Sequence, residues 1–388
     1  MNIPITKTNF TEAEINSVLE PLQSGWLVQG PKVKDFEDKW CAFTGAQNSI
    51  AVTSCTSGLH LSLAASGFGP GDEAIVPAFT WISTANVVEH LGGKVVFCDI
   101  DLKTFNINVD EIESKITERT KAIFPVHLFG LSGDMDPILD LARKYNLFVV
   151  EDAACGFGAK YKGHHVGSFG NTGCFSFHPR KAITTGEGGM VTTNDADLAE
   201  KIRRLRDHGA AMTDLQRHLG ARPYLLADHP DAGYNQRMTD LQAAIGSAQM
   251  DRAEDIVSER QALAKRYDEE FAELDWLRTP FKHLDYDHGY QSYPCLFMHE
   301  EISVSSTEQI NAKRNAWMDD LQKSGISTRP ATHAVHMLSF YKNKYNLESS
   351  DFANAYAADQ CSISLPLFHG MKENEQDFVI EKVLEFKK

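Results

Sequence analysis

The sequence lacks the features that mark membrane and secreted proteins. No apolar run among its 388 residues approaches the roughly 20 residues that a membrane-spanning helix needs. The 7 cysteines are odd in number and scattered without a C-x-x-C pair, which argues against a disulfide framework and a structural zinc site. The first residues, MNIPITKTNF, have neither the basic end nor the apolar run of a signal peptide. We therefore expect a cytoplasmic protein that is not inserted into a membrane.

Several common catalytic and binding motifs are also missing. The chain has no GxSxG, P-loop or GxGxxG motif, and its histidines do not form an HExxH pattern, so we predict no metal site. The formal net charge of −15 repels nucleic acid, which we exclude as a partner. What is present is an ordinary globular composition, 42% hydrophobic, in a chain long enough for two domains.

Short apolar runs alternate with helical stretches in the first half of the chain. Runs such as 49–53 and 147–153 have the length and composition of buried strands, and stretches such as 134–146 have those of helices. This alternation is typical of a mostly parallel sheet covered by helices on both faces. We predict an α/β fold with a large domain over residues 1–250 and a smaller α+β domain over residues 251–388.

Three other segments have distinct patterns. A capping box formed by Thr11 and Glu14 predicts one helix over residues 11–22. Residues 218–233 show no periodicity and are predicted to form a loop. Residues 239–274 form a long helical tract, which we expect to be bent.

Polar residues follow several of the predicted strands, where parallel sheets bind their ligands. Cys55, Thr56 and Ser57 follow the first strand and open a helix. Hydroxyl groups, backbone N–H groups and the electric field of the helix N-terminus favour the binding of a phosphate there. The alternative is that these residues only form an ordinary helix N-cap. Trp81 follows the second strand and either stacks on a flat ring or packs in the core. Asp152 ends a buried strand, where a carboxylate is costly unless a cation such as a ring nitrogen pairs with it.

Lys181 lies between a predicted strand and a glycine-rich patch. Gly186, Gly188 and Gly189 indicate a tight turn where the backbone passes close to something. A lysine whose charge is made costly by its surroundings is a nucleophile suited to Schiff-base chemistry, although an ordinary exposed lysine is the alternative. A phosphate site, a stacking aromatic, a buried acid and a lysine together match the requirements of pyridoxal 5′-phosphate (PLP).

The same segments carry a resemblance to a known family. It lies in the stretches SGWLVQGPKVKDFE, PVHLFGLSGDMDPI, VVEDAACGFGA, FSFHPRKAITTGEGGMVTTND and GYNQRMTDLQAAIG. These resemble the sugar aminotransferases of the DegT/DnrJ/EryC1/StrS family, within the fold type I or aspartate aminotransferase superfamily, over almost the whole chain. The resemblance implies a seven-stranded, mostly parallel sheet sandwiched by helices, PLP as the cofactor and a homodimer with shared active sites.

The resemblance also implies roles for individual residues. Lys181 is expected to bind PLP covalently and carry the proton, and Asp152 to hold the pyridinium nitrogen. Further cofactor contacts are implied for Cys55, Thr56, Ser57, Trp81, Cys155 and Ser176. Cys155 stands where relatives often have a glutamine or histidine, and Asn235 is implied to reach the phosphate of the neighbouring subunit. Positions that line the substrate pocket are implied for Trp26, His127 and Arg329.

The function implied is transamination. An amino group passes from L-glutamate, which leaves as 2-oxoglutarate, to a keto or aldehyde sugar. A nucleotide-linked 4-keto-6-deoxy sugar for cell-surface polysaccharide or lipopolysaccharide biosynthesis is the favoured acceptor, and a sugar acid such as an 8-oxo-3-deoxy-octulosonate is the alternative. A PLP-dependent sugar dehydratase would carry a histidine in place of Lys181. A non-catalytic homologue would not need both Lys181 and Asp152, so both rivals are disfavoured.

Overall fold

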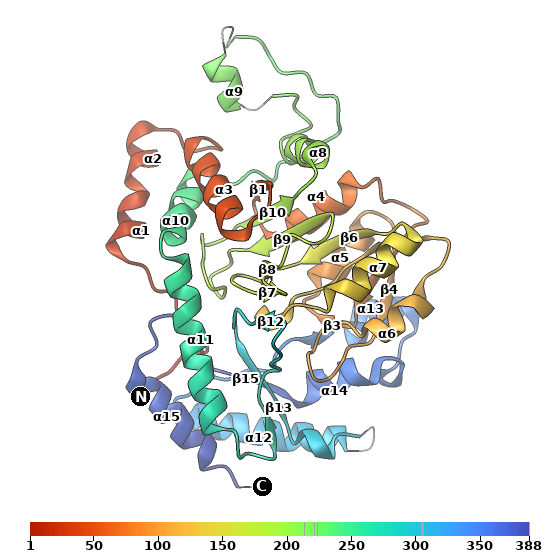
Figure 1. Cartoon of the computed structure of the whole chain (residues 1–388), viewed down its shortest axis with the longest axis vertical. Helices are drawn as coiled ribbons and strands as arrows, with labels where there is room; N and C mark the ends of the chain where they lie inside the picture. Colours follow the sequence, from red (N-terminus) through yellow and green to blue (C-terminus); the bar gives the residue numbers. More distant parts are fainter. Residues whose placement is uncertain (213, 221, 223, 304–305, 388) are drawn as a thin grey trace.

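A seven-stranded sheet forms the centre of the chain (Figure 1). The computed structural model describes residues 1–212, 214–220, 222, 224–303 and 306–387. In spatial order the strands are β1 (Asn48–Val52), β10 (Gly189–Thr193), β9 (Thr172–Ser176), β6 (Phe148–Asp152), β5 (Thr120–Ile123), β2 (Glu73–Pro77) and β4 (Lys94–Cys98). Only β10 runs against its neighbours, so the predicted mostly parallel sheet is confirmed.

Helices cover both faces of this sheet because successive side chains of each strand point to opposite faces. One face packs against α4 (Cys55–Ala65), α5 (Ser83–His90) and α8 (Ala196–Arg206). The other face packs against α3 (Pro31–Thr44) and α10 (Asp240–Met250) at one end, and against α6 (Val109–Ile112) and α7 (Met135–Tyr145) at the other. Val150 and Val149 illustrate the alternation, since they belong to different apolar clusters on opposite faces.

The C-terminal part of the chain contains a second, smaller sheet. Its sheet has the order β11 (Leu277–Arg278), β13 (Tyr293–Phe297) and β15 (Ser362–Leu365), all antiparallel. Its helices are α12 (Thr307–Lys323), α13 (Ser339–Tyr345), α14 (Ala353–Cys361) and α15 (Glu373–Leu384). Short strand pairs complete the fold: β7 (Lys160–Tyr161) with β8 (His164–His165) and β12 (Tyr286–Asp287), and β3 (Phe79–Thr80) with β14 (His333–Ala334).

The long helix α11 (Ala253–Glu270) connects the two parts (Figure 1). Ile256 and Val257 pack in the cluster beneath the large sheet, whereas Ala264 and Tyr267 pack in the cluster that contains the small sheet. The N-terminal segment also reaches the C-terminal part, since Ile3 pairs with Ile326. A division at residues 250 and 251 remains a prediction.

Two of the local predictions differ from the structure in detail. The single helix expected over residues 11–22 is two helices, α1 (Glu12–Ser17) and α2 (Leu19–Ser24), although the capping box of Thr11 and Glu14 is present. The break has a simple cause, because Pro21 has no N–H to bond the carbonyl four residues earlier. The segment predicted as a loop begins inside α9 (Asp214–Leu219), which projects at the top of Figure 1.

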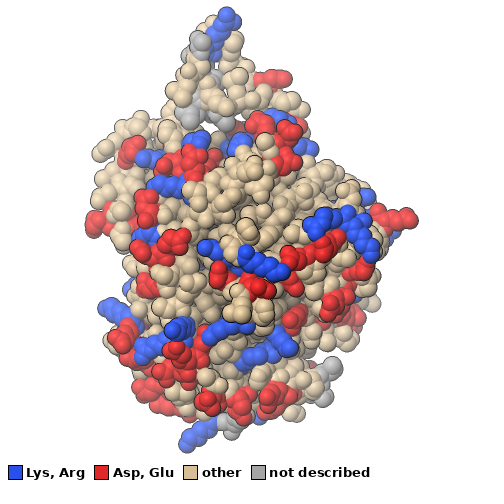
Figure 2. All heavy atoms as spheres, in the orientation of Figure 1, with Lys and Arg blue, Asp and Glu red and all other residues tan. Residues whose placement is uncertain are grey.

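The tract at 239–274 is interrupted between α10 and α11, as expected. Within the described ranges, no helix combines the length and the apolar composition of a membrane span. Acidic and basic side chains intermingle over the face shown in Figure 2.

Candidate active site

Lys181 lies in the turn that joins β9 to β10. The backbone N–H of Lys181 donates to the carbonyl of His178 at 2.8 Å, and Thr185 N–H donates to the carbonyl of Phe177 at 3.0 Å, so the turn is closed by its own backbone. Gly186 has φ +82°, a conformation that favours glycine. The Lys181 side chain is half-buried, and its Nζ lies 3.1 Å from Cys155 Sγ. The lysine therefore faces the loop that follows β6.

Asp152 is the last residue of β6 and lies on the same side of the sheet edge. Its side chain is 3% exposed, and its Oδ2 accepts a hydrogen bond of 2.6 Å from the hydroxyl of Thr84 in α5. Its Oδ1 accepts from Ala154 N–H at 3.1 Å and lies 3.9 Å from Cys55 Sγ. No basic side chain pairs with Asp152 within the described residues. This buried carboxylate is therefore oriented but lacks a cation, and a protonated ring nitrogen would supply one.

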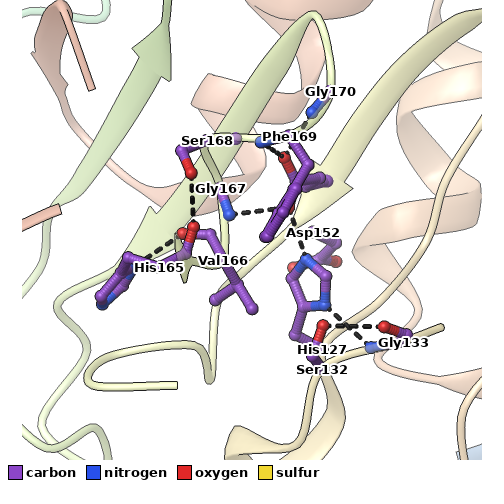
Figure 3. Close-up of polar contacts among 12 residues, drawn as sticks. His127, Ser132, Gly133, Asp152, His165, Val166, Gly167, Ser168, Phe169 and Gly170 are labelled. Carbon is purple, nitrogen blue, oxygen red and sulfur yellow. Dashed lines mark hydrogen bonds and ion pairs between the residues drawn. The ribbon is translucent and has the colours of Figure 1, made fainter. Parts of the chain in front are cut away.

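The neighbouring acid, Glu151, points to the opposite face and is fully buried. The backbone N–H groups of Gly167, Phe169 and Gly170 donate to its two oxygens at 2.7, 2.8 and 2.7 Å (Figure 3). His127 Nε2 lies 2.8 Å from the same carboxylate. Four hydrogen bonds thus satisfy Glu151 inside the protein, and it holds the loop at residues 167–170 against β6.

The position of His127 corrects one of the sequence-based predictions. Its ring is 0% exposed, and its Nδ1 accepts a hydrogen bond of 3.1 Å from Gly133 N–H (Figure 3). Since Nδ1 is an acceptor, we assign the ring proton to Nε2, which donates to Glu151. His127 supports the protein interior and offers no surface to a substrate, so its assignment to the substrate pocket is wrong.

The predicted phosphate site is built around the N-terminus of α4. Ser54 caps the helix through a 3.1 Å bond from Ser57 N–H to its Oγ, and the Ser57 hydroxyl lies 2.8 Å from Thr53 Oγ1. Thr56 is half-buried, and its hydroxyl forms no hydrogen bond within the described part of the chain. A Cβ on Gly189 would lie 2.4 Å from the carbonyl carbon of Ser54, so glycine is required for β10 to approach. The N-cap and the phosphate site are compatible, because free N–H groups and hydroxyls face the same end of the helix.

Cys55 differs from its two neighbours in this segment. Its side chain is buried, and its Sγ lies 3.4 Å from the carbonyl oxygen of Cys174. Burial, followed by the charge of Asp152, raises the pKa of the Cys55 thiol well above its usual value. The thiol is therefore neutral, and only the backbone of Cys55 is placed to contact a phosphate.

Two of the remaining predicted cofactor residues, Cys155 and Ser176, line a cleft beside Lys181. This cleft contains about 230 Å³ of empty space, and its lining includes Cys155, Ser176, Lys181 and Gln291. Trp81 is 54% exposed, and its ring centroid lies 5.7 Å from that of His333, which the β3–β14 pair brings alongside. A large aromatic ring held at the surface is available for stacking, whereas the core-packing alternative is excluded by its exposure.

Three other predicted residues lie in different surroundings. Trp26 is half-buried, donates from Nε1 to the carbonyl of Gln29 at 3.3 Å and packs edge-on against His218 of α9. Asn235 is exposed, as a contact with a second subunit requires. Arg329 is half-buried, and burial followed by the charge of Arg180 lowers the pKa of its guanidinium. The charge of Arg329 interacts with Arg180 and with Cys155, which lie next to Lys181 in the sequence and in space, respectively.

The geometry fits PLP. Lys181 supplies the amine, Asp152 an unpaired carboxylate, Trp81 an exposed ring, and Thr56 and Ser57 hydroxyls at a helix N-terminus. Sequence reasoning missed Thr84, whose contact with Asp152 spans 68 residues and has no local signal. In the described parts of the chain, no group of His, Cys, Asp and Glu is placed to hold a metal ion.

Comparison with known proteins gives consistent matches along the chain. Residues 8–384 match the model of the DegT/DnrJ/EryC1/StrS aminotransferase family. The spore coat polysaccharide biosynthesis protein SpsC of Bacillus subtilis strain 168 is 40% identical over 382 residues, which cover 98% of this chain and 96% of that protein. GDP-perosamine synthase of Caulobacter vibrioides is 39% identical over 369 residues, which cover 95% and 93%.

Solved structures are similar over the same length. The PLP form of a Streptococcus pneumoniae protein that bears the name of a sugar aminotransferase superposes with a TM-score of 0.88 at 30% identity, covering 98% of this chain and 97% of that one. PseC of Helicobacter pylori, an aminotransferase involved in the biosynthesis of pseudoaminic acid, superposes with a TM-score of 0.89 at 26% identity and covers 99% of both chains.

Proposed function

This chain belongs to the DegT/DnrJ/EryC1/StrS aminotransferase family, and from that premise we propose that it transfers an amino group from L-glutamate to a nucleotide-linked 4-keto-6-deoxy sugar. The predictions of the family, the fold type I architecture, an aminotransferase and PLP as cofactor are confirmed by the matches above. The acceptor is proposed because a relative 39% identical over nearly the whole chain is a GDP-perosamine synthase. The product would enter a cell-surface polysaccharide or lipopolysaccharide.

The observation that carries this proposal is the placement of Lys181 opposite Asp152 across one sheet edge. Bound PLP supplies an electron sink that stabilises negative charge at the substrate carbon. Lys181 Nζ, half-buried beside Cys155, takes the proton from the donor carbon and later returns it to the sugar carbon. Thr84 fixes the Asp152 carboxylate through a 2.6 Å bond, and this carboxylate would pair with the ring nitrogen of bound PLP.

We propose that the other residues of the site hold and orient the cofactor. The hydroxyls of Thr56 and Ser57, with the field of the α4 N-terminus, are proposed to bind the phosphate. Ser176 lines the cleft next to Lys181 and is proposed to join them. Trp81 would cover one face of the ring and keep water from it.

We further propose that the active unit is a homodimer. Asn235 is exposed, and within the described residues its backbone forms a bridge to Asp207 while its side-chain amide has no hydrogen-bond partner. A side-chain amide in this position can donate to a phosphate held by a second copy. Each active site would then contain residues from both subunits.

A substrate panel tests the proposed acceptor. The purified enzyme is incubated with L-glutamate and, separately, with several nucleotide-linked 4-keto-6-deoxy sugars, an 8-oxo-3-deoxy-octulosonate and free keto sugars, while 2-oxoglutarate is measured. We expect turnover with a nucleotide-linked sugar. Turnover with free sugars or the sugar acid alone would reject the nucleotide-linked acceptor, and no 2-oxoglutarate with any acceptor would reject glutamate as the donor.

A further inference from the structure

Cys155 and Lys181 bring a thiol and an amine into contact at the edge of the large sheet. Lys181 Nζ donates to Cys155 Sγ over 3.1 Å. Both side chains are half-buried, and both line the cleft of about 230 Å³, so a small molecule that enters the cleft reaches the pair. The proposed transamination uses the amine, and its steps give no role to the sulfur.

Cys155 differs from the other six cysteines of the chain. All seven thiols are free. Five of the others are buried, and burial raises the pKa of each of these thiols: Cys55, Cys98, Cys174, Cys295 and Cys361. Cys41 is half-buried like Cys155, but its Sγ lies 3.1 Å from the hydroxyl of Ser49 and contacts no amine. An accessible cysteine beside a lysine is the kind that oxidants attack first.

Short turns hold the backbones of the two residues in place. Cys155 lies inside a turn in which Gly156 N–H donates to the Ala153 carbonyl at 2.8 Å. Lys181 ends a turn in which its own N–H donates to the His178 carbonyl at 2.8 Å. The flexible four-carbon stem of the lysine lets Nζ approach the sulfur more closely while both turns stay fixed. A reaction between Nζ and Sγ is therefore intramolecular and requires no change of the fold.

We propose that a hydroperoxide converts this pair into a reversible covalent bond between Cys155 Sγ and Lys181 Nζ, which inactivates the enzyme. In the first step the sulfur attacks the peroxide, so that an S–O bond forms and the O–O bond breaks. The peroxide leaves as water or an alcohol, and the sulfur is oxidised by two electrons to a sulfenic acid. In the second step the lone pair of Nζ attacks this sulfur. An N–S bond forms, the S–O bond breaks, and the hydroxide leaves as water with a proton from the amine.

Thiols reverse this reaction. One thiol attacks the sulfur and displaces Nζ, which takes up a proton, and a second thiol then releases Cys155 and leaves as part of a disulfide. While the N–S bond exists, Lys181 can neither hold PLP nor transfer a proton. PLP attached to Lys181 occupies the same nitrogen, so the bond forms only while the amine is free, as in enzyme that holds the cofactor in its amine form, pyridoxamine 5′-phosphate. Enzyme that has accepted an amino group and has no sugar to pass it to is therefore the sensitive form.

Mass spectrometry of the loaded enzyme tests the bond directly. The wild type is loaded with pyridoxamine 5′-phosphate, treated with hydrogen peroxide, digested and mapped. We expect a peptide that links Cys155 to Lys181 and is lighter by two hydrogen atoms than the two separate peptides, and we expect dithiothreitol to remove it. A second sample, in which borohydride has fixed PLP on Lys181 before the peroxide is added, should form no link because the nitrogen is occupied.

The capacity of Lys181 to take up PLP is the second measurement. After the treatment each protein is dialysed against PLP, and the PLP that borohydride traps on Lys181 is measured with and without dithiothreitol. Trapping by the wild type should fall by about 10-fold and return with dithiothreitol, because a linked lysine has no free amine. Cys155→Ser should stay within about 2-fold of its own untreated level, and Cys41→Ser, the matched control, should respond as the wild type does. The unfolding temperature identifies a misfolded variant, and Cys155→Ala then replaces Cys155→Ser.

The outcomes decide between this bond and other oxidation products. A linked peptide that is heavier by one oxygen atom would overturn the direct N–S bond. Cys155 recovered only as a sulfinic acid, or in a disulfide with another cysteine, would overturn the reaction between the pair. An equal loss of trapping in Cys155→Ser and the wild type would place the damage elsewhere and reject the inactivation by this bond. None of these results depends on the amino donor or the sugar, which the substrate panel tests separately.

Discussion

Replacing Glu151 with glutamine should destabilise the protein strongly, although glutamine has nearly the same shape. The carboxylate accepts four hydrogen bonds, two at each oxygen, from the loop at residues 167–170 and from His127. A glutamine amide retains one acceptor oxygen and turns an NH₂ group toward two donors. Two hydrogen bonds to a charged group are lost and two buried donors become unsatisfied, at about 1.5–3 kcal/mol each. The expected loss is about 3–6 kcal/mol of the free energy of unfolding.

Thermal unfolding measures this loss. At about 2 °C per kcal/mol, which is appropriate for a large domain, the Tm of Glu151→Gln should fall by about 6–12 °C. Glu113→Gln is the control, because Glu113 is exposed and, among the described residues, its carboxylate accepts hydrogen bonds from Lys144 and Tyr145. A Tm within 2 °C of the wild type (a margin of about 1 kcal/mol) would show that the four contacts do not hold the loop, and the structural role of Glu151 would be refuted.

The remaining predictions concern the site and the effect of pH. Lys181→Ala should lower turnover by more than about 10³-fold and abolish covalent trapping of PLP by borohydride, and retained trapping on this variant would contradict the assignment. Asp152→Asn should reduce kcat while the dimer persists, whereas an unchanged kcat would leave Asp152 only structural. The Asn235→Ala variant should retain less PLP during dialysis than the wild type. Mixing it with the Lys181→Ala variant should restore activity, because a mixed dimer has one intact active site. No recovery of activity in the mixture would argue against shared active sites. Burial lowers the pKa of His165 to about 4 and of His288 to about 3, so both remain neutral in the folded protein. In the unfolded chain both histidines bind protons below about pH 6.5, so each one should lower the free energy of unfolding by about 2 kcal/mol at pH 5. A urea midpoint that does not fall between pH 7 and pH 5 would refute this.

The central sheet could be predicted because its strands are apolar on both faces. β2, for example, is buried along its whole length, so its sequence is a continuous apolar run between turns. The principal site residues could be found for a related reason, since Lys181 and Asp152 follow strands whose carboxyl ends meet at one edge. Local pattern and the position of the site are linked in this class of fold.

Contacts between distant segments could not be predicted in the same way. Thr84 contacts Asp152 across 68 residues, and no periodicity or motif points from one to the other. The helices α13 and α14 were not predicted. They are short and their periodicity is weak, so tertiary packing rather than the local sequence pattern decides that they form.

Glu151 and Asp152 have different roles that the structure reveals and the sequence does not: Glu151 stabilises the fold, and Asp152 belongs to the candidate active site. They are adjacent carboxylates on one strand, and the alternation of side chains sends them to opposite faces. Glu151 is neutralised by N–H groups of its own chain, whereas Asp152 has an orienting hydroxyl and, in the described residues, no cation. A charge that the fold positions but does not balance requires a partner from outside, and here that charge is the Asp152 carboxylate. This pattern matches a ligand with a cationic nitrogen, which the pyridine ring of bound PLP would supply.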